Sequence, residues 1–221
     1  MSNATEMRLG IRALAAFVIA AVVYWTAVML AMHALETQFN PLRAPMSAYV
    51  LGGHGVWVTT TYFVLSASLL CVGYCMLRTL PRTRLTSTAF VFCAVATIGA
   101  ALAGSFPMDF PGPPFTLSGR LHAAGGVLTF FPWVLGTLSF TLALRTDPRW
   151  QGVSGWLTAL AAGVAVALAV LIFSVRILGY AGGAQRLLVV LLFAWMILAV
   201  YRVIRLSAGG GAAEQRVEAN A

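Results

Sequence analysis

Residues 184–204 read AQRLLVVLLFAWMILAVYRVI, and between Arg186 and Arg202 this segment carries no charged side chain. About 20 predominantly apolar residues in a helix cross the roughly 30 Å of hydrocarbon in a bilayer. Similar stretches occur upstream at Ile11–His33, Val56–Leu77, Thr86–Phe106, Leu121–Leu144 and Ser154–Val175. The sequence therefore predicts an all-α membrane protein with one domain, residues 11–206, built as a bundle of six transmembrane helices.

The composition excludes a soluble globular domain. Apolar residues make up 60% of the chain and charged residues 9%, which leaves too few polar side chains to cover a water-exposed surface. The first apolar stretch is similar to a secretory signal peptide, because Arg8 and Arg12 precede it. The apolar region of a signal peptide is only about 7–15 residues long, however, whereas this stretch continues to His33 without a clear cleavage motif. We expect a retained helix.

The basic residues, all of them arginine, are divided unequally between the two sides of the predicted bundle. The larger set, on the side that holds both termini, comprises Arg8, Arg12, Arg78, Arg82, Arg84, Arg145, Arg149, Arg202, Arg205 and Arg216. The smaller set, in the first, third and fifth loops along the chain, comprises Arg43, Arg120, Arg176 and Arg186. Because short cytoplasmic loops carry the excess of positive charge, we expect both termini in the cytoplasm and loops one, three and five outside.

This orientation also accounts for the net charge of +8. The positive charge is explained by the arginines that mark the cytoplasmic side of the membrane, so the expected partner is the lipid bilayer and not a nucleic acid. Residues 1–10 are predicted to form a cytoplasmic segment, and the glycine-rich residues 207–221 a flexible cytoplasmic tail.

Small residues at helical spacing predict where helices pack. Close backbone approach supplies the contact energy between helices in lipid. The expected stripes are Gly155, Ala159, Gly163 and Ala167 on the fifth helix and Ala96, Ala100 and Gly104 on the third. Cys71, Cys75 and Cys93 all map to the cytoplasmic half of the bilayer, where a disulfide is not expected; they either pack as small apolar residues or form a soft-metal site.

Polar and conformationally restricted residues gather in the three outer loops. Loop one contains NPLRAPMSAY at 40–49 and GGHG at 52–55; loop three contains FPMDFPGPP at 106–114, followed by RLH at 120–122; loop five ends in GYAGGAQR at 179–186. His33, His54, His122, Glu36 and Asp109 all fall near this face. The candidate ligand-binding residues are Arg43, Ser47, His54, Asp109, Arg120, His122 and Arg186.

The order of these motifs is similar to that of a known family. An Asn-Pro…Ser segment at 40–47 precedes the second helix, a Phe-Pro-x-Asp segment at 106–109 follows the third, His122 opens the fourth, and a glycine-rich turn with Arg186 precedes the last. From about Arg12 to Arg205 the chain resembles the uncharacterised prokaryotic membrane family catalogued as domain of unknown function 998. The resemblance implies a six-helix fold in the inner membrane of a prokaryotic cell and supplies no activity. The Pro-Gly-Pro-Pro insert at 111–114 departs from the family pattern.

Two function classes follow for the outer loops. The first is an integral membrane protein of unknown biochemical function whose loops one, three and five form a polar pocket for a lipid or small molecule. The second is an outward-facing, metal-dependent hydrolase acting on lipid, because imidazoles and a carboxylate can bind zinc and leave a position for an activated water. Ser47, Asp109 and His122 also loosely resemble the Ser, Asp and His of seven-helix membrane hydrolases and receptors, although the closing histidine pair of that superfamily is missing.

Structural roles compete with both classes. Asp109 is expected to form an ion pair with Arg43, Arg120 or Arg186, and His122 to donate to a loop carbonyl. Haem held between paired histidines is a further alternative, but these histidines lie near helix ends. Transport needs polar groups at the membrane midplane, where this chain has mainly alanine, leucine, valine and phenylalanine. The identity of any metal or cofactor is left open by the sequence.

Overall fold

The computed structural model describes residues 3–110, 116–178 and 180–218, without the side chains of 3, 4, 176, 178 and 209–218. Its long helices are α1 Asn3–Leu35, α2 Gly55–Thr79, α3 Arg84–Ser105, α4 Leu117–Leu144, α5 Gln151–Phe173 and α6 Ala181–Glu218. Short helical turns occur at η1 Met46–Leu51, η2 Pro148–Trp150 and η3 Ser174–Leu178. All six long helices are long and apolar enough to cross a membrane, which confirms the predicted fold class.

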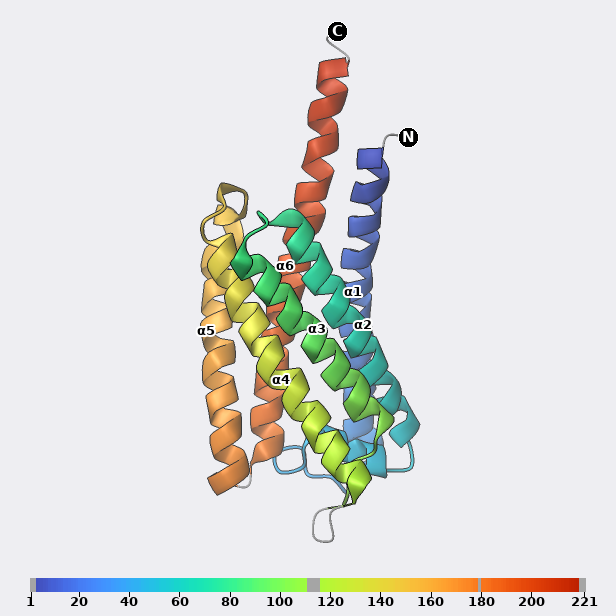
Figure 1. Ribbon diagram of the computed structural model, residues 1–221. Coiled ribbons are helices and arrows are strands. Elements are labelled where there is room, and N and C mark those ends of the chain that lie inside the picture. Colours follow the sequence, from blue (N-terminus) through green and yellow to red (C-terminus); the bar gives the residue numbers. More distant parts are fainter. Residues whose placement is uncertain (1–2, 111–115, 179, 219–221) are drawn as a thin grey trace.

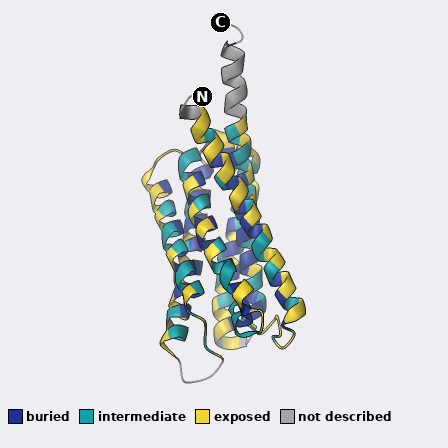
Figure 2. Cartoon of the chain, turned by 90° about the vertical axis from the view of Figure 1, so that its right-hand side faces the viewer, coloured by how far each residue is buried: buried dark blue, intermediate teal, exposed yellow. Residues whose placement is uncertain are grey.

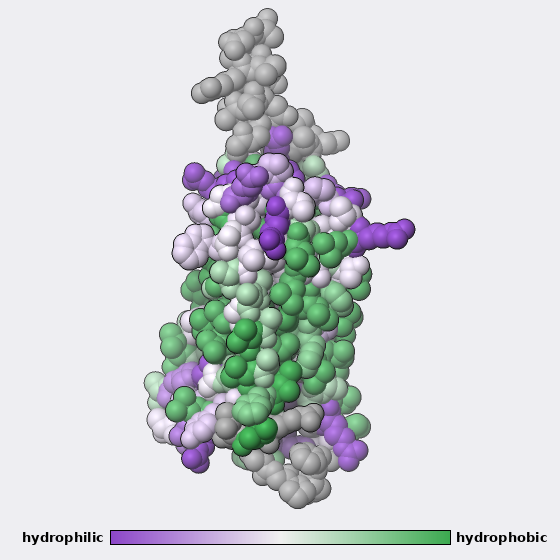
Figure 3. All heavy atoms as spheres, turned by 90° about the vertical axis from the view of Figure 1, so that its left-hand side faces the viewer, coloured by the Kyte–Doolittle hydropathy of each residue, from purple (hydrophilic) through white to green (hydrophobic). Residues whose placement is uncertain are grey.

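The helices form one elongated bundle in which α1 begins and α6 ends at the same end (Figure 1). We call this the arginine end, and the opposite end, formed by loops one, three and five, the loop end. Buried residues line the interior and exposed ones the outside (Figure 2). A hydrophobic band separates hydrophilic groups at the two ends (Figure 3), as expected for a protein surrounded by lipid.

Helix boundaries differ from the apolar stretches chiefly at the chain ends. The predicted last span stops at Ile204, whereas α6 continues as helix to Glu218 through much of the segment predicted to be a flexible tail. The Pro-Gly-Pro-Pro insert at 111–114, which departs from the family pattern, lies outside the described residues. At the start of α3, Thr83 and Thr86 form reciprocal side-chain to backbone hydrogen bonds that satisfy orphan amide groups.

The closest helix packing is between α3 and α4, and α4 contacts α5 much less. A Cβ atom added to Gly99 would lie 2.5 Å from the backbone nitrogen of Thr129, and one added to Gly125 would lie 2.6 Å from the backbone nitrogen of Ala103. These glycines therefore allow the two backbones to touch. At Gly155, by contrast, no atom lies within 4 Å of an added Cβ, so the predicted packing stripe on α5 is wrong at this position.

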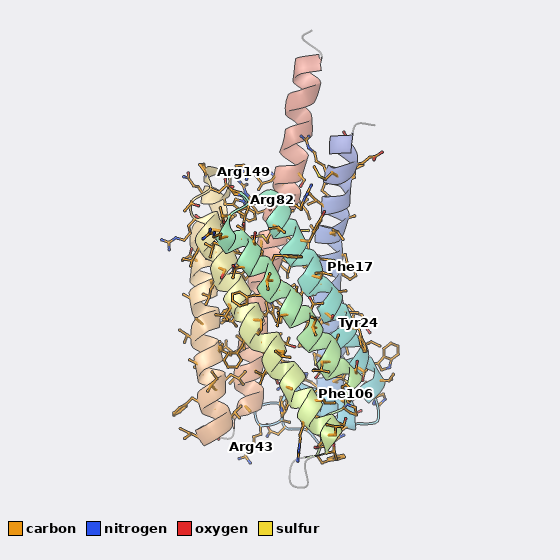
Figure 4. The ribbon with its side chains drawn as sticks, viewed as in Figure 1. Phe17, Tyr24, Arg43, Arg82, Phe106 and Arg149 are labelled. Carbon is orange, nitrogen blue, oxygen red and sulfur yellow. The ribbon has the colours of Figure 1, made fainter. Side chains whose placement is uncertain are left out.

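Arg82 and Arg149 lie at the arginine end, and Arg43 lies at the loop end (Figure 4). Hydrogen bonds between helices stabilise the arginine end. Asp147 accepts from Arg149 at 2.6 Å, and Arg149 also donates 2.7 Å to the Thr79 carbonyl at the end of α2. Arg202 of α6 donates from Nε to the Arg149 carbonyl at 3.0 Å. Three helices are thus linked where most arginines gather.

Candidate functional site

Arg186 fastens loop one to the start of α6. One terminal nitrogen, Nη1, donates to the carbonyls of Pro41 at 2.6 Å and of Ala44 and Gly182 at 3.0 Å each. The other, Nη2, donates 3.2 Å to the Tyr49 hydroxyl. A Cβ atom at Gly182 would lie 2.2 Å from the Ala44 carbonyl oxygen, so glycine is needed for this close approach. Loop one is therefore held as a fixed cover across the bundle.

The same arginine fixes the protonation pattern of His33. Arg186 Nε donates to His33 Nε2 at 3.0 Å, so this ring nitrogen acts as an acceptor. The other nitrogen, Nδ1, lies 2.5 Å from the Met29 carbonyl oxygen and must donate to it. His33 is thus a neutral imidazole with both nitrogens occupied, and neither is left for a metal or a ligand.

His54 is paired with Glu36. The Glu36 Oε1 atom accepts from the backbone nitrogen of His54 at 2.7 Å and lies 2.8 Å from its Nδ1, while Oε2 accepts from Gln38 at 2.7 Å. The Gln38 hydrogen bond, followed by those from His54, lowers the pKa of Glu36 to about 2. The carboxylate is buried against Gly52. This pair closes the two ends of loop one.

Asp109 binds the start of α4 instead of an arginine. It accepts from the Thr116 backbone nitrogen at 2.8 Å and from the Thr116 hydroxyl at 2.6 Å. None of the described arginine side chains forms an ion pair with it. Thr116 in turn caps α4 by accepting from Gly119. The expected arginine partner is therefore wrong: the exposed amide and hydroxyl at the helix start supply enough donors, and they lie seven residues away along the chain.

His122 is held by the end of α3. Its Nδ1 lies 3.0 Å from the Ala103 carbonyl oxygen and 2.9 Å from that of Phe106. Carbonyls at a helix end lack intrahelical donors, so Nδ1 must carry the proton and donate to them. The ring packs edge-on against Tyr62 at 5.8 Å between centroids and is 9% exposed. Nδ1 is thus used structurally, and Nε2 is the acceptor that is left.

A cavity of about 370 Å³ lies beneath loop one, beside His122. Its walls come from all the long helices except α5, with η1 and η3 beside them, and most of the lining is apolar. Trp25 and Trp133 line its apolar part, and Ser47, Tyr62 and Gln185 supply polar groups. This size and mixture are typical of a small-molecule site.

A second cavity of about 540 Å³ adjoins the first between α4, α5 and α6. Its walls include Val127, Phe131 and Val175, which are 57%, 42% and 64% exposed on the outside of the bundle. The residues that line both cavities are Pro45, Ala123, Gly126, Phe130, Val175 and Gln185. The inner cavity therefore adjoins a second one that reaches the exposed side of the bundle, where α4 contacts α5 little.

Of the residues predicted from the loops, only Ser47 and His122 line the inner cavity. Arg43 and Arg120 are exposed, and the other three have the structural partners described above. Among the described residues, no group of three His, Cys, Asp or Glu side chains is placed to hold a metal ion. The geometry thus does not assemble the ligand set that the hydrolase alternative needs.

Comparison with known proteins gives a family match. The family model described as "Protein of unknown function (DUF998)" matches residues 18–202. The chain belongs to the DUF998 family. This confirms the resemblance carried by the loop motifs. No curated protein and no solved structure matches the chain.

The matched part of this DUF998 protein contains every residue that lines the two cavities. Sequence reasoning did not select Tyr62 or Gln185 as site residues. Tyr62 lies inside an apolar stretch, where its hydroxyl gives little signal beyond the preceding threonines, and Gln185 was hidden beside Arg186. Ala123 and Gly126, which follow His122 on α4, both border the cavity.

Proposed function

We propose that this DUF998 protein binds an amphipathic molecule taken from the bilayer, with the apolar part of that molecule in the cavity beneath loop one. The observation that carries the proposal is that a largely apolar cavity adjoins a second one on the exposed side of the bundle, and we take the second cavity as its lateral opening to lipid. A ligand dissolved in the bilayer reaches such a site without crossing water. Loop one, fastened by Arg186 and the Glu36–His54 pair, blocks the direct route from the loop end.

We also propose that the loop end faces outward from the cytoplasmic membrane of a prokaryotic cell. The arginine split between the two ends supports this orientation. The ligand would then come from the outer leaflet, because the cavity lies at the loop end. Binding without chemical conversion accounts for this arrangement, since the side chains of Arg186, Glu36 and Asp109 are hydrogen-bonded to other groups of the loops.

Gly126 offers a direct test. It lines both cavities, and no atom lies within 4 Å of a Cβ added there, so Gly126→Phe should occlude the site without displacing backbone. Gly155→Phe is the matched control, because Gly155 also has open space around it but lies on α5 away from the cavities. Both variants should fold, as judged by the unfolding temperature in detergent.

Bound lipids are then extracted from the purified proteins and quantified by mass spectrometry. We expect the wild type and Gly155→Phe to retain the same amphiphile and Gly126→Phe to lose most of it. Equal retention by all three proteins would show that the cavity is not the binding site.

A further inference from the structure

The lining of the inner cavity contains no arginine, aspartate or glutamate. A charged group that enters such a space loses its hydration without gaining an ion-pair partner, which is unfavourable. The nearest arginine along the chain from Gln185 is Arg186, and its guanidinium is already used by carbonyls, His33 and Tyr49. The site therefore favours a neutral head group.

The imidazole of His122 supplies a buried acceptor in the cavity wall. His122 is more than nine-tenths buried, its Nδ1 is occupied by the α3 carbonyls, and its Nε2 has no hydrogen bond within the described part of the chain. Among the described side chains, Trp150 Nε1 is the one nitrogen or oxygen atom that is both inaccessible to solvent and without a hydrogen-bond partner. Because His122 Nε2 also has no partner, it must be accessible, and the ring that carries it lines the cavity.

Gln185 supplies the complementary donor. Its Oε1 accepts from the Met46 backbone nitrogen at 2.8 Å, which fixes the orientation of the amide. The NH₂ group, with two protons, has no hydrogen bond within the described residues, and Gln185 lines both cavities. The cavity thus combines an imidazole acceptor with an amide donor.

We infer that the ligand is a neutral amphiphile whose head is a hydroxyl group. This inference rests on the proposed function and specifies its ligand class. A hydroxyl both donates and accepts, so it matches His122 Nε2 and the Gln185 amide, whereas an ether oxygen can only accept and a phosphate brings charge. The apolar chain extends toward the lateral opening past Phe130 and Val175.

The test measures competition for tritiated hexadecan-1-ol bound to the full-length protein in detergent. The competitors are unlabelled hexadecan-1-ol, its methyl ether and hexadecyl phosphate. Because the ether leaves His122 Nε2 unpaired, we expect it to bind about tenfold more weakly than the alcohol. Hexadecyl phosphate should compete more weakly still. Equal affinity for all three competitors would overturn the hydroxyl assignment.

Two substitutions separate the two ring nitrogens of His122. The Asn amide nitrogen is attached at the same carbon position as Nδ1, so His122→Asn keeps a donor for the α3 carbonyls and removes the Nε2 acceptor. We expect it to unfold at the wild-type temperature and to bind alcohol and ether equally. His122→Gln places its amide near the Nε2 position and should restore part of the alcohol preference with lower stability. A full alcohol preference in His122→Asn would contradict the inference.

The outcomes also distinguish the two proposals. If the three competitors bind equally and Gly126→Phe abolishes their binding, the cavity binds amphiphiles and the hydroxyl assignment fails alone. If hexadecan-1-ol does not bind the wild type, the hydroxyl assignment fails, and the extraction of bound lipids decides the proposed function separately. If it binds Gly126→Phe equally well, the cavity is not its site and both proposals fail. The wild-type comparison of alcohol and ether decides the assignment even if a His122 variant does not fold.

Discussion

At the scale of single residues, most polar groups of the loop end are satisfied by one another, whereas His122 Nε2 and the Gln185 amide nitrogen face the cavity without a described partner. Arg186 is stabilised by three carbonyls, a hydroxyl and a neutral imidazole, and no described carboxylate pairs with it. Carbonyl oxygens carry enough partial negative charge to solvate a guanidinium when several converge. A cation of this kind holds structure, because its Nε and Nη1 donors are fully used and its Nη2 already donates to Tyr49.

Glu36 gives a pH prediction at the same scale. Its folded-state pKa of about 2 lies below the ordinary value of 4.5, so acid protonates the unfolded chain first. The stability that Glu36 contributes is complete above about pH 4.5 and is lost as the pH falls toward 2. We expect the unfolding temperature of the wild type in detergent to fall through this window more steeply than that of Glu36→Gln.

The control for this prediction is Glu6→Gln, which changes an exposed carboxylate in α1. Asp147, whose pKa is lowered by its hydrogen bond from Arg149, is present in every protein and cancels in the comparison. Glu6→Gln should reproduce the wild-type curve. Parallel curves for wild type and Glu36→Gln would mean that the buried carboxylate does not contribute to acid sensitivity.

At the scale of helices, the closest helix–helix contact is between α3 and α4, at Gly99 and Gly125. Gly99→Ala places a methyl group 2.5 Å from α4 backbone atoms and should destabilise the protein by about 1–3 kcal/mol, because backbone cannot move aside as a side chain can. Gly155→Ala meets open space and should be neutral or stabilising by up to about 1 kcal/mol, since alanine favours helix. Thermal unfolding in detergent measures both. A Gly99→Ala protein as stable as Gly155→Ala would exclude the close backbone contact between α3 and α4.

The helices and their approximate limits could be predicted from the sequence, because each apolar stretch meets the length requirement of a bilayer independently of the others. The hydrogen-bond partners of the loop residues could not be predicted from the sequence. Asp109 pairs with Thr116 and His54 with Glu36, and such pairs depend on the fold of loops one and three. The spacing of Gly155 and Ala159 also looks like a packing stripe, yet both residues are exposed, because alanine-rich helices produce this spacing by chance.

At the scale of the whole molecule, the two ends have different chemistry. Arginines of the arginine end donate across helices, as Arg149 does to α2 and Arg202 does to η2, while the loop end contains the covered cavity. A bilayer between them would place the lateral opening of the cavity in one leaflet. Which leaflet supplies the ligand therefore depends on orientation.

Orientation gives the last prediction. The ten-to-four division of arginines predicts that the arginine end is cytoplasmic. Alkaline phosphatase, which is active only after export, should be inactive when fused after Arg205 and active when inserted after Arg43, an exposed loop-one residue. Green fluorescent protein fused at the same two positions should give the opposite pattern. Active phosphatase after Arg205 would reverse the topology, and the ligand would then have to come from the cytoplasmic leaflet.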